Sequence, residues 1–457
     1  MEPTRDLGVS LSGGGHRATV FGLGVLLALV DQRLNQRIVS ISSVSGGSIA
    51  NGIAMVGPDI GTTDPAEFER HLSPALQALA ERGVLLGGAP ATRGYIRTLA
   101  AVACATLVSI LVALVSIAAH WWVVLLVAVV FAVVAGFMTL RLFHLRSSRT
   151  ERAIDTELLG GRMRTLADLR ATPSSVHHVI CTTELQTGTS FYFTNRAVYG
   201  YGFGGAAAGI DLPLATAVQA SACVPGAFLP RTIELAQLQV AATGRIVVSD
   251  GGVYDNMADE WEYGYQGRRR SWPELETVQS SPAEFVLIAN ASGGWNDLKP
   301  ITGNGLRLEL TGLLRAKDVQ YDVSTAHRRR ALAALFRSTG RDGLEGAFAQ
   351  ITASPFDVTE QFGPKPDWTP DERSARAVAA REFLLASGYT KSEWESWARE
   401  TSGVATTLAP LGGTITAKLL EHGYVLTMIN LFVIHGLGEL VPIDRARFAR
   451  LCRPATG

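Results

Sequence analysis

A long uncharged stretch in the middle of the chain places the strongest constraint on its fold. The 43 residues from Thr98 to Leu140 contain no Asp, Glu, Lys or Arg. As one helix, this stretch would be about 65 Å long at 1.5 Å per residue, whereas the hydrocarbon core of a bilayer is about 30 Å thick. Two passes therefore fit better than one. We expect a helical hairpin, Leu99–Ala118 and Val123–Phe143, that spans a membrane twice.

The residues around this stretch indicate how the hairpin would sit in a bilayer. His120, Trp121 and Trp122 would lie in the turn at the far interface, where indole rings are favoured. Arginines gather at the near ends of both helices, namely Arg93, Arg97, Arg141, Arg146, Arg149 and Arg152. The positive-inside rule then places both ends in the cytoplasm. The alternative is a buried helical pair in a soluble core, but the polar stripes that such pairs usually carry are not evident.

Composition excludes several classes of partner. The 457 residues include 41 basic and 41 acidic side chains and no basic stripe interleaved with aromatic residues, so we expect no nucleic-acid partner. The four cysteines are scattered without C-x-x-C spacing, which predicts reduced thiols, with Cys104 facing lipid, and no metal site. The segment Met1–Asp6 lacks the apolar core of a signal peptide, which favours a cytoplasmic location for the rest of the chain.

Outside the hairpin, short β-prone runs alternate with helix-compatible stretches, a pattern typical of an α/β sheet with helices on both sides. The predicted strands are Leu7–Leu11, Ile38–Ile41, Val176–Thr182, Ser190–Thr194, Gly244–Ser249 and Phe285–Asn290. The predicted helices are Leu212–Ala222 and Glu372–Ala386. We expect residues 200–209 to form a flexible loop, and the apolar run Leu426–Ile434 to form a core or interfacial helix instead of a third span.

A serine stands in a sharp turn directly after the second predicted strand, in the sequence Ser43-Val44-Ser45-Gly46-Gly47. A nucleophile on a tight strand-to-helix turn needs small residues two positions before and after it, usually as G-x-S-x-G. Here Ser43 takes the first small position and Gly47 the second. A helix that begins just after Ser45 would also stabilise negative charge there. The alternative is an ordinary polar turn.

The turn after the first strand contains three consecutive glycines, Gly13, Gly14 and Gly15, followed by Arg17. Without Cβ atoms, the backbone N–H groups of such a turn could converge on an oxyanion, and preorganised donors of this kind contribute about 3–4 kcal/mol each to acyl transfer. The turn also partly fits a dinucleotide-binding fingerprint. That reading requires an acidic residue at the end of the second strand, and this strand ends in serines instead.

A serine nucleophile needs a group that accepts its proton. None of the nine histidines lies in an obvious catalytic turn, and His177 and His178 open a predicted strand. Asp250 is the better candidate because it ends a predicted strand and is followed by Gly251 and Gly252, so its carboxylate could point into a cleft. The alternative is a turn-forming aspartate, since Asp-Gly is a common turn dipeptide.

Taken together, these segments resemble the patatin-like phospholipase family. The resemblance rests on the Gly-Gly-Gly-x-Arg turn, the serine elbow, the segment Ala220-Ser221-Ala222-Cys223-Val224-Pro225-Gly226-Ala227-Phe228, and Asp250-Gly251-Gly252, in that order. The strand and turn Thr182–Gly188 also look like the family's. The resemblance covers residues 5–95 and 150–300. Two positions depart from the family pattern: Ser43 replaces a glycine, and Ala18 stands where a glycine often follows the basic residue.

The resemblance implies a three-layer α/β/α sandwich with a mostly parallel central sheet and a Ser45–Asp250 dyad that works without histidine, metal or cofactor. Ser45 would attack an ester carbonyl, Asp250 would accept its proton, and water would hydrolyse the acyl-enzyme. Gly14 and Gly15 would hold the oxyanion, with Gly13 close by. Arg17 would support the oxyanion, contact a lipid phosphate or hold a helix end.

We therefore expect a discontinuous catalytic domain over residues 1–95 and 150–300, an inserted hairpin over 98–143, and a helix-rich C-terminal extension over 301–457. The predicted function is a membrane-anchored serine lipid acyl hydrolase that acts on phospholipids or lysophospholipids in the bilayer. Arg328-Arg329-Arg330 could attract anionic headgroups, although such charge runs are usually a solvated face. The alternatives are an inactive anchored protein that binds lipid or a partner, and a transporter, for which two helices without internal charge offer no ion pathway.

Overall fold

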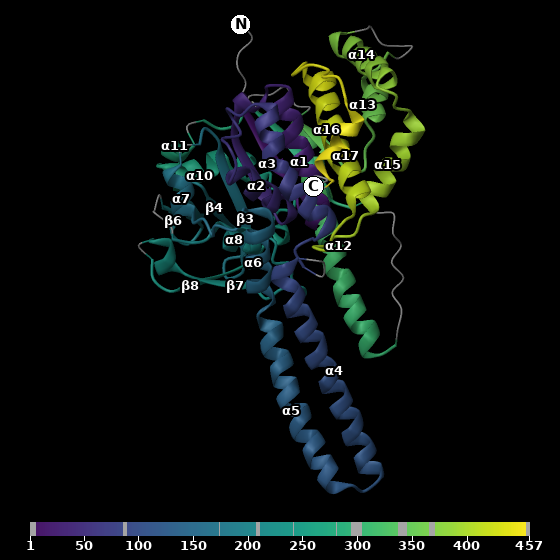
Figure 1. Cartoon of the computed structure of the whole chain (residues 1–457). Coiled ribbons are helices and arrows are strands. Elements are labelled where there is room, and N and C mark those ends of the chain that lie inside the picture. Colours follow the sequence, from purple (N-terminus) through teal and green to yellow (C-terminus); the bar gives the residue numbers. More distant parts are fainter. Residues whose placement is uncertain are drawn as a thin grey trace.

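The computed structural model describes residues 6–85, 89–172, 174–206, 211–240, 242–279, 281–293, 304–336, 345–364 and 371–453. Within them, one sheet of ten strands runs in the order β10-β9-β1-β2-β3-β4-β5-β6, with β8 pairing with β3 and β7 (Figure 1). The strands are β1 Leu7–Leu11, β2 Ile38–Val44, β3 His177–Glu184, β4 Thr189–Thr194, β5 Val198–Gly200, β6 Gly204–Ala206, β7 Arg231–Glu234, β8 Arg245–Asp250, β9 Phe285–Asn290 and β10 Glu345–Gln350.

The sheet has a parallel half and an antiparallel half. The neighbours from β10 to β3 pair in parallel, and every pairing that involves β4 to β8 is antiparallel. β9 is buried at every residue, as expected for a strand covered by helices on both faces. The six predicted strands are all present, two of them with the predicted bounds. The α/β prediction is confirmed.

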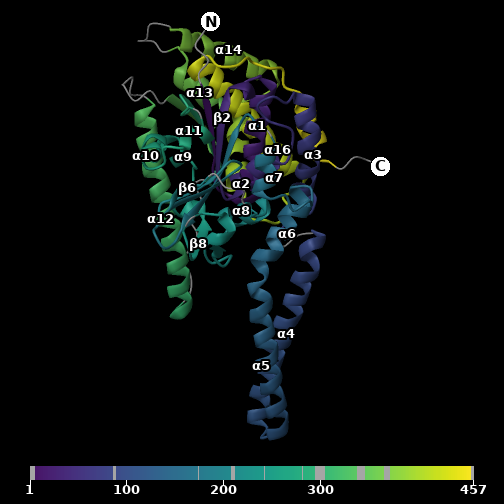
Figure 2. The same cartoon turned by 90° about the vertical axis from the view of Figure 1, so that its left-hand side faces the viewer.

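Helices cover both faces of the sheet and complete three layers, which Figure 2 shows nearly edge-on. The helices that precede the hairpin or form it are α1 Gly15–Asp31, α2 Gly46–Met55, α3 Pro65–Glu81, α4 Pro90–Ala118 and α5 Trp122–His144. Those that follow it are α6 Arg146–Leu158, α7 Leu166–Ala171, α8 Leu214–Ser221, α9 Glu260–Tyr263, α10 Tyr265–Ser271, α11 Leu275–Val278, α12 Leu306–Leu335, α13 Pro355–Phe362, α14 Glu372–Ala386, α15 Lys391–Gly403, α16 Gly413–Asn430 and α17 Arg445–Leu451.

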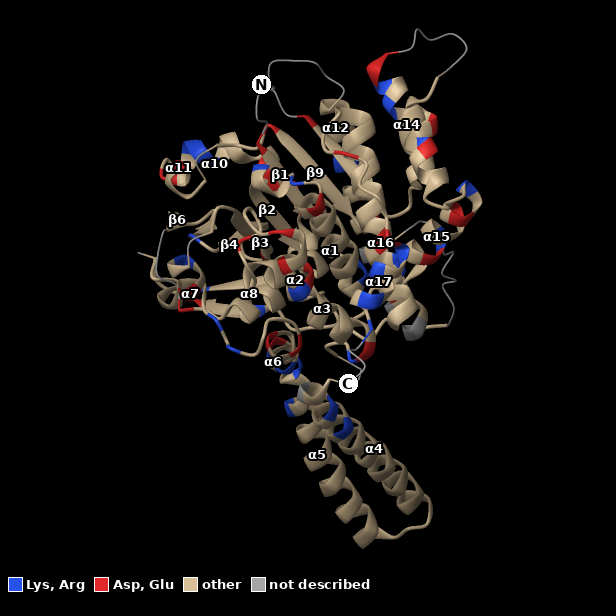
Figure 3. Cartoon of the chain, turned by 45° about the horizontal axis from the view of Figure 1, so that its top comes forward, with Lys and Arg blue, Asp and Glu red and all other residues tan. Residues whose placement is uncertain are grey.

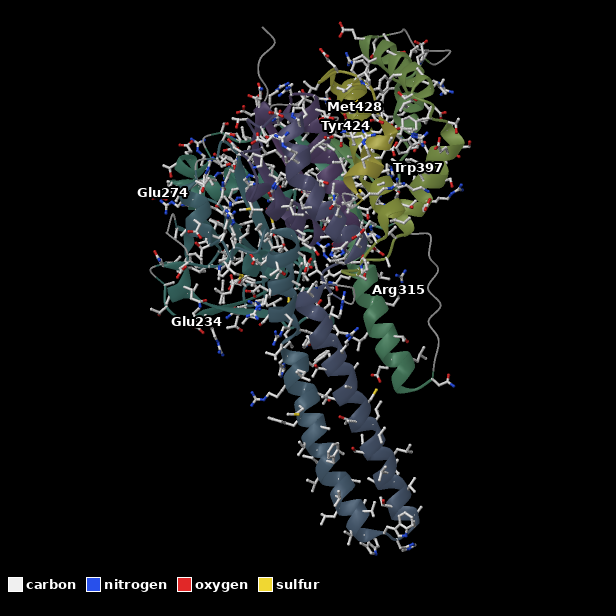
Figure 4. The ribbon with its side chains drawn as sticks, in the orientation of Figure 1. Glu234, Glu274, Arg315, Trp397, Tyr424 and Met428 are labelled. Carbon is white, nitrogen blue, oxygen red and sulfur yellow. The ribbon has the colours of Figure 1, made fainter. Side chains whose placement is uncertain are left out.

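The C-terminal part belongs to the core of the molecule. A Cβ atom on Gly24 of α1 would lie 2.1 Å from the Leu420 carbonyl oxygen, and one on Gly423 of α16 would lie 2.2 Å from that of Phe21. The two helix backbones therefore touch, which only glycine permits. Tyr424, labelled in Figure 4, donates its hydroxyl to Asp31 at the end of α1 (2.7 Å). Of the two alternatives left open for the run Leu426–Ile434, a core or an interfacial helix, the packing favours the core helix. The run lies in α16 and in the π-helical turn Leu431–His435 that continues it, and 78% of the most apolar window is buried.

Two features of the chain correct the sequence analysis. β6 (Gly204–Ala206) adds a strand within the segment predicted as a flexible loop, of which residues 207–210 lie outside the described residues. β10 joins the edge of the main sheet beside β9 and was not predicted, although the C-terminal part is otherwise helix-rich, as expected. The Gly-Gly-Ala run of β6 has no β-prone side chains although it pairs with the adjacent strand β5, and β10 depends on pairing with β9, far back in the chain.

The hairpin stands away from the sandwich as two long helices, α4 and α5 (Figure 1). Both are long and apolar enough to cross a membrane, and only 11% of each apolar window is buried. Trp121 is 60% exposed and Val123 is 77% exposed, whereas soluble proteins rarely present such a continuous apolar surface. His120 adopts the left-handed conformation (φ 58°) that a glycine would ordinarily supply in the turn. Lys and Arg residues gather at the base of the hairpin (Figure 3).

The base of the hairpin is fixed to the catalytic half of the chain. Tyr95 on α4 donates its hydroxyl to the Leu142 carbonyl on α5 (2.8 Å), which holds the two helices together. Arg146, at the start of α6, donates from Nε to the Ala227 carbonyl (2.7 Å) and packs its guanidinium over the Phe143 ring. The hairpin therefore leaves the sandwich beside the segment 220–228.

Candidate active site

The ends of two strands meet on one edge of β3. β2 runs parallel to β3 and ends with Val44 opposite Cys181. β8 runs antiparallel to β3 and ends with Asp250 opposite Thr182, the next residue. A Cβ atom on Gly251 would lie 2.5 Å from the Val44 side chain. Ser45 directly follows the end of β2, and Asp250 is the last residue of β8. Because both strands pair with β3, the two residues are brought together.

Ser45 occupies a strained turn between β2 and α2. Its backbone has φ 52° and ψ −120°, a conformation that non-glycine residues rarely adopt and that persists only where the surroundings enforce it. Cβ atoms on Gly46 and Gly47 would lie 2.1 Å from the Gly15 carbonyl oxygen and 2.2 Å from that of Leu11. The Gly47 N–H donates to the Ser12 carbonyl (3.1 Å). The start of α2 is thus pressed against the glycine turn.

The serine that replaces the first elbow glycine fits the turn well. The Ser43 hydroxyl donates to the Val179 carbonyl on β3 (2.9 Å). It accepts from Ser48 (3.2 Å) and from the Asn51 side chain (2.9 Å), both on α2. These bonds lie beneath the elbow and join it to the neighbouring strand and helix. The departure at this position therefore leaves the turn intact.

Ser221 holds the elbow from the other side. Its hydroxyl accepts from the Ser45 N–H (3.0 Å), donates to the Cys181 carbonyl (2.6 Å) and lies 2.8 Å from the Ser48 hydroxyl. Two residues on, the Cys223 carbonyl accepts from the Asp250 N–H (3.2 Å). One segment thus positions both Ser45 and Asp250. This segment is part of the family resemblance, but no role for Ser221 was predicted from the sequence.

The three glycines of the first turn differ in what their N–H groups do. The Gly13 N–H donates to the Asn256 carbonyl (3.0 Å), and a Cβ atom on Gly13 would lie 3.2 Å from that of Ser45. Gly14 and Gly15 have φ 144° and 60°. Among the residues that the structure describes, no protein acceptor is recorded for the N–H of Gly14 or Gly15. The N–H groups of Gly14 and Gly15 thus remain available as donors beside Ser45. Gly13, which has no side chain, leaves room for the Ser45 side chain.

Arg17 is buried, and its hydrogen bonds go to the main chain. Its guanidinium donates to the carbonyl oxygens of Ala291 (3.0 Å), Ser402 (3.4 Å) and Val404. Burial lowers the pKa of Arg17 to about 10. These contacts join the glycine turn to the ends of β9 and α15. Of the roles predicted for Arg17, they favour a structural one.

The Asp250 carboxylate is held at its Oδ1 atom by the Gly252 N–H (2.8 Å). Two further side chains, neither predicted from sequence, surround it. Asn256 is buried and places Oδ1 2.2 Å from the position of a Gly13 Cβ atom. The Tyr321 hydroxyl on α12 lies 2.4 Å from the position of a Gly252 Cβ atom. Burial, followed by the charges of Asp250 and Asp255, raises the pKa of Tyr321 well above its usual value.

The histidines near this region are structural. His16 contacts the Ala409 carbonyl (2.9 Å), His177 contacts Gln279 (3.1 Å) and His178 contacts Asn51 (2.7 Å). Burial lowers the pKa of His16 and His178 to about 4 and that of His177 to about 3, so all three are neutral at pH 7. Within the described residues, no group of three His, Cys, Asp or Glu side chains could hold a metal ion.

A strained serine elbow, a glycine turn with available donors and an aspartate at the adjoining strand end are the parts that a serine hydrolase of the α/β class requires. The chain belongs to the patatin-like phospholipase family, whose model matches residues 9–258. That range includes both glycine-rich turns, the hairpin and Asp250. The family consists of serine hydrolases that act on lipid acyl esters.

Among solved structures, the chain is similar to human GIVD cytosolic phospholipase A2 at 16% identity, with 43% of this chain and 22% of that chain covered and a TM-score of 0.25. It is also similar to VipD from Legionella pneumophila at 13% identity, with 99% of this chain and 89% of that chain covered and a TM-score of 0.28. The chain thus spans less than a quarter of the human enzyme. A search of the curated proteins finds no match.

Proposed function

We propose that this protein is a membrane-anchored lipid acyl hydrolase in which Ser45 is the nucleophile and Asp250 the general base. The observation that supports it most strongly is the meeting of β2 and β8 on β3, which sets Ser45 and Asp250 at adjoining strand ends beside the glycine turn. No histidine is needed, because the carboxylate can take the serine proton directly.

The reaction proceeds through an acyl-enzyme. Ser45 Oγ attacks the ester carbonyl carbon while Asp250 accepts the hydroxyl proton. The N–H groups of Gly14 and Gly15 stabilise the oxyanion, at about 3–4 kcal/mol each. The ester C–O bond then breaks, and the leaving alcohol takes the proton from Asp250. Water, deprotonated by Asp250, then attacks the acyl carbonyl carbon, the bond from that carbon to Ser45 Oγ breaks, and Ser45 takes the proton back from Asp250 as the fatty acid leaves.

The placement of the site supports a substrate within the bilayer. β1 starts on the side of the sheet away from the hairpin (Figure 1), so the carboxyl ends of the parallel strands face the hairpin. The Ala227 carbonyl, in the segment that positions Ser45 and Asp250, is bonded to Arg146 at the hairpin base. An anchored hairpin would therefore hold the site at the membrane surface. The arginines at its base favour the cytoplasmic face.

A fluorophosphonate probe tests this proposal. We expect the full-length protein in detergent to be labelled covalently, Ser45→Ala to lose all labelling, and Asp250→Asn to lose at least 100-fold in labelling rate, because a general base contributes about 10²–10⁴-fold. Thermal melts of the variants check that they remain folded. If folded wild-type protein takes no label, the alternative holds: an inactive, anchored protein of the same fold that binds lipid or a partner.

A further inference from the structure

A cavity of about 250 Å³ adjoins the candidate active site on the side of α12. Its walls come from the ends of β9 and β10 and from α12, and they include Ser292, Tyr321, Thr325, Arg329 and Gln350. This volume is below the roughly 300–1,000 Å³ of pockets for drug-sized ligands. The cavity therefore suits one polar group better than an acyl chain.

The cavity is linked to Ser45 through Asn256 and Gly13. Ser292, in its wall, accepts from the Asn256 side chain (2.9 Å). The main-chain carbonyl of Asn256 accepts the Gly13 N–H, so Asn256 lies against Gly13. A Cβ atom on Gly13 would lie 3.2 Å from the Cβ atom of Ser45. Tyr321 lines the cavity and also reaches Gly252, beside Asp250. A substrate whose ester meets Ser45 could thus extend a neighbouring group into this cavity.

The three consecutive arginines of α12 have different surroundings. Arg328 forms ion pairs with Asp259 (2.7 Å) and Glu260 (3.0 Å) and lies 3.5 Å from Asp255, so its charge is satisfied and it fixes α12 to the chain after Asp250. Arg330 is exposed and does not line the cavity. Arg329 does line it, and among the described residues no carboxylate is paired with it. The cavity wall thus contains a guanidinium that forms no ion pair with a described carboxylate.

The wall beside Arg329 offers further donors. Thr325 lies one turn earlier on the same face of α12, and its hydroxyl is buried without a hydrogen-bond partner among the described atoms. An arginine beside a hydroxyl is a common arrangement for binding phosphate oxygens, since the planar guanidinium can donate two parallel bonds. Asp322 also lines the cavity, and a carboxylate there repels a doubly charged phosphomonoester more strongly than a singly charged phosphodiester.

We propose that this cavity binds the phosphodiester of the substrate headgroup, with Arg329 and Thr325 as its ligands. This inference rests on the proposed function and names its substrate class: phospholipids and lysophospholipids over neutral acylglycerols. Arg329 acts as a specificity residue and takes no part in the chemistry at Ser45.

Hydrolysis of matched substrates tests the proposal. The full-length protein is assayed in phosphate-free buffer with lysophosphatidylethanolamine and with a monoacylglycerol of the same acyl chain. We expect Arg329→Gln to lose about 10- to 100-fold in kcat/KM on the lysophospholipid, as for loss of a hydrogen bond to a charged group, and to keep wild-type activity on the monoacylglycerol. Arg330→Gln is the matched control and should match wild type on both. An Arg329→Gln variant that retains lysophospholipid hydrolysis, or loses both activities equally, overturns the proposal and leaves the proposed function intact.

Binding separates this proposal from the proposed function. In Ser45→Ala protein, glycerophosphoethanolamine should raise the melting temperature, and Arg329→Gln introduced into that protein should abolish the shift. This holds even if wild-type protein hydrolyses neither substrate, a result that would reject only the hydrolase function. If inorganic phosphate gives an Arg329-dependent shift and glycerophosphoethanolamine gives none, the cavity is a free-phosphate site and the headgroup assignment is wrong.

Discussion

At the scale of single residues, the site depends on side chains that hold the backbone of the nucleophile in place. Ser45 itself is strained, and the bonds that Ser43 and Ser221 make to β3 and α2 offset that strain. The serine at position 43 weakened the sequence motif, yet its hydroxyl makes three bonds that glycine could not make. A motif defined by small residues therefore tolerates a polar one where the space beneath the turn contains partners.

Ser221 gives the first prediction at this scale. Ser221→Ala removes the acceptor of the Ser45 N–H and the donor to Cys181, and an unsatisfied buried group costs about 1–3 kcal/mol. We expect the free energy of unfolding to fall by that amount and kcat to fall more than tenfold with little change in KM, because the elbow loses its fixed geometry. Denaturant titration and steady-state kinetics measure the two effects. An unchanged kcat would show that Ser221 has no positioning role.

At the scale of elements, the contact between α1 and α16 explains how the C-terminal part completes the fold. α1 is buried on every side, which is unusual for a helix on one sheet and requires a second covering element. α16 supplies that cover because Gly24 and Gly423 let the two backbones touch. The loop after α15 then reaches the glycine turn, where the His16 N–H donates to the Thr407 carbonyl (2.9 Å).

Gly423 tests this contact. Gly423→Val would place side-chain atoms against the Phe21 carbonyl and the backbone of α1, and overpacking in a core costs about 1–3 kcal/mol or more. We expect a lower melting temperature and weaker fluorophosphonate labelling. Gly403→Ala is the control, since nothing lies within 4 Å of a Cβ atom there. Equal melting temperatures for the two variants would contradict a tight α1–α16 contact.

At the scale of the whole molecule, the hairpin exposes its apolar side chains, whereas the sandwich buries its own in a core. The apolar side chains of α4 and α5 are open along their length, whereas the most apolar window of the α16 region is mostly buried. The three helices are all long enough to cross a membrane, but the mean hydropathy of that window is 1.3 for the α16 region and 2.6 and 2.9 for the hairpin helices. The packing follows the same division, because only the two hairpin helices leave their apolar surface uncovered.

Replacement of the hairpin tests its role. Because Tyr95 contacts Leu142, the chain at Arg97 and Arg141 can be joined by a short Gly-Ser linker. We expect the shortened protein to be soluble without detergent, to keep fluorophosphonate labelling at Ser45, and to lose most activity on phospholipid vesicles while still cleaving a soluble ester. Wild-type protein that remains soluble without detergent, and that does not partition into vesicles, would contradict the membrane anchor.

The sequence by itself determined where several helices and strands lie and which residues are candidates for the active site. Charge-free length predicted the hairpin, local patterns predicted β1 and β9 with their bounds, and the motifs brought forward Ser45 and Asp250, whose catalytic roles stay predictions. Such features depend on neighbours along the chain, which a sequence displays directly.

The tertiary structure decided which distant segments touch. It brought β2 and β8 together on β3, directed Arg17 towards main-chain carbonyls, placed Tyr321 and Arg329 beside the site, and buried α16 against α1. No local pattern encodes these contacts, because each arises from the register of strands and the packing of helices far apart in the chain. Whether each apolar helix lies in the core or stands exposed follows from the same packing.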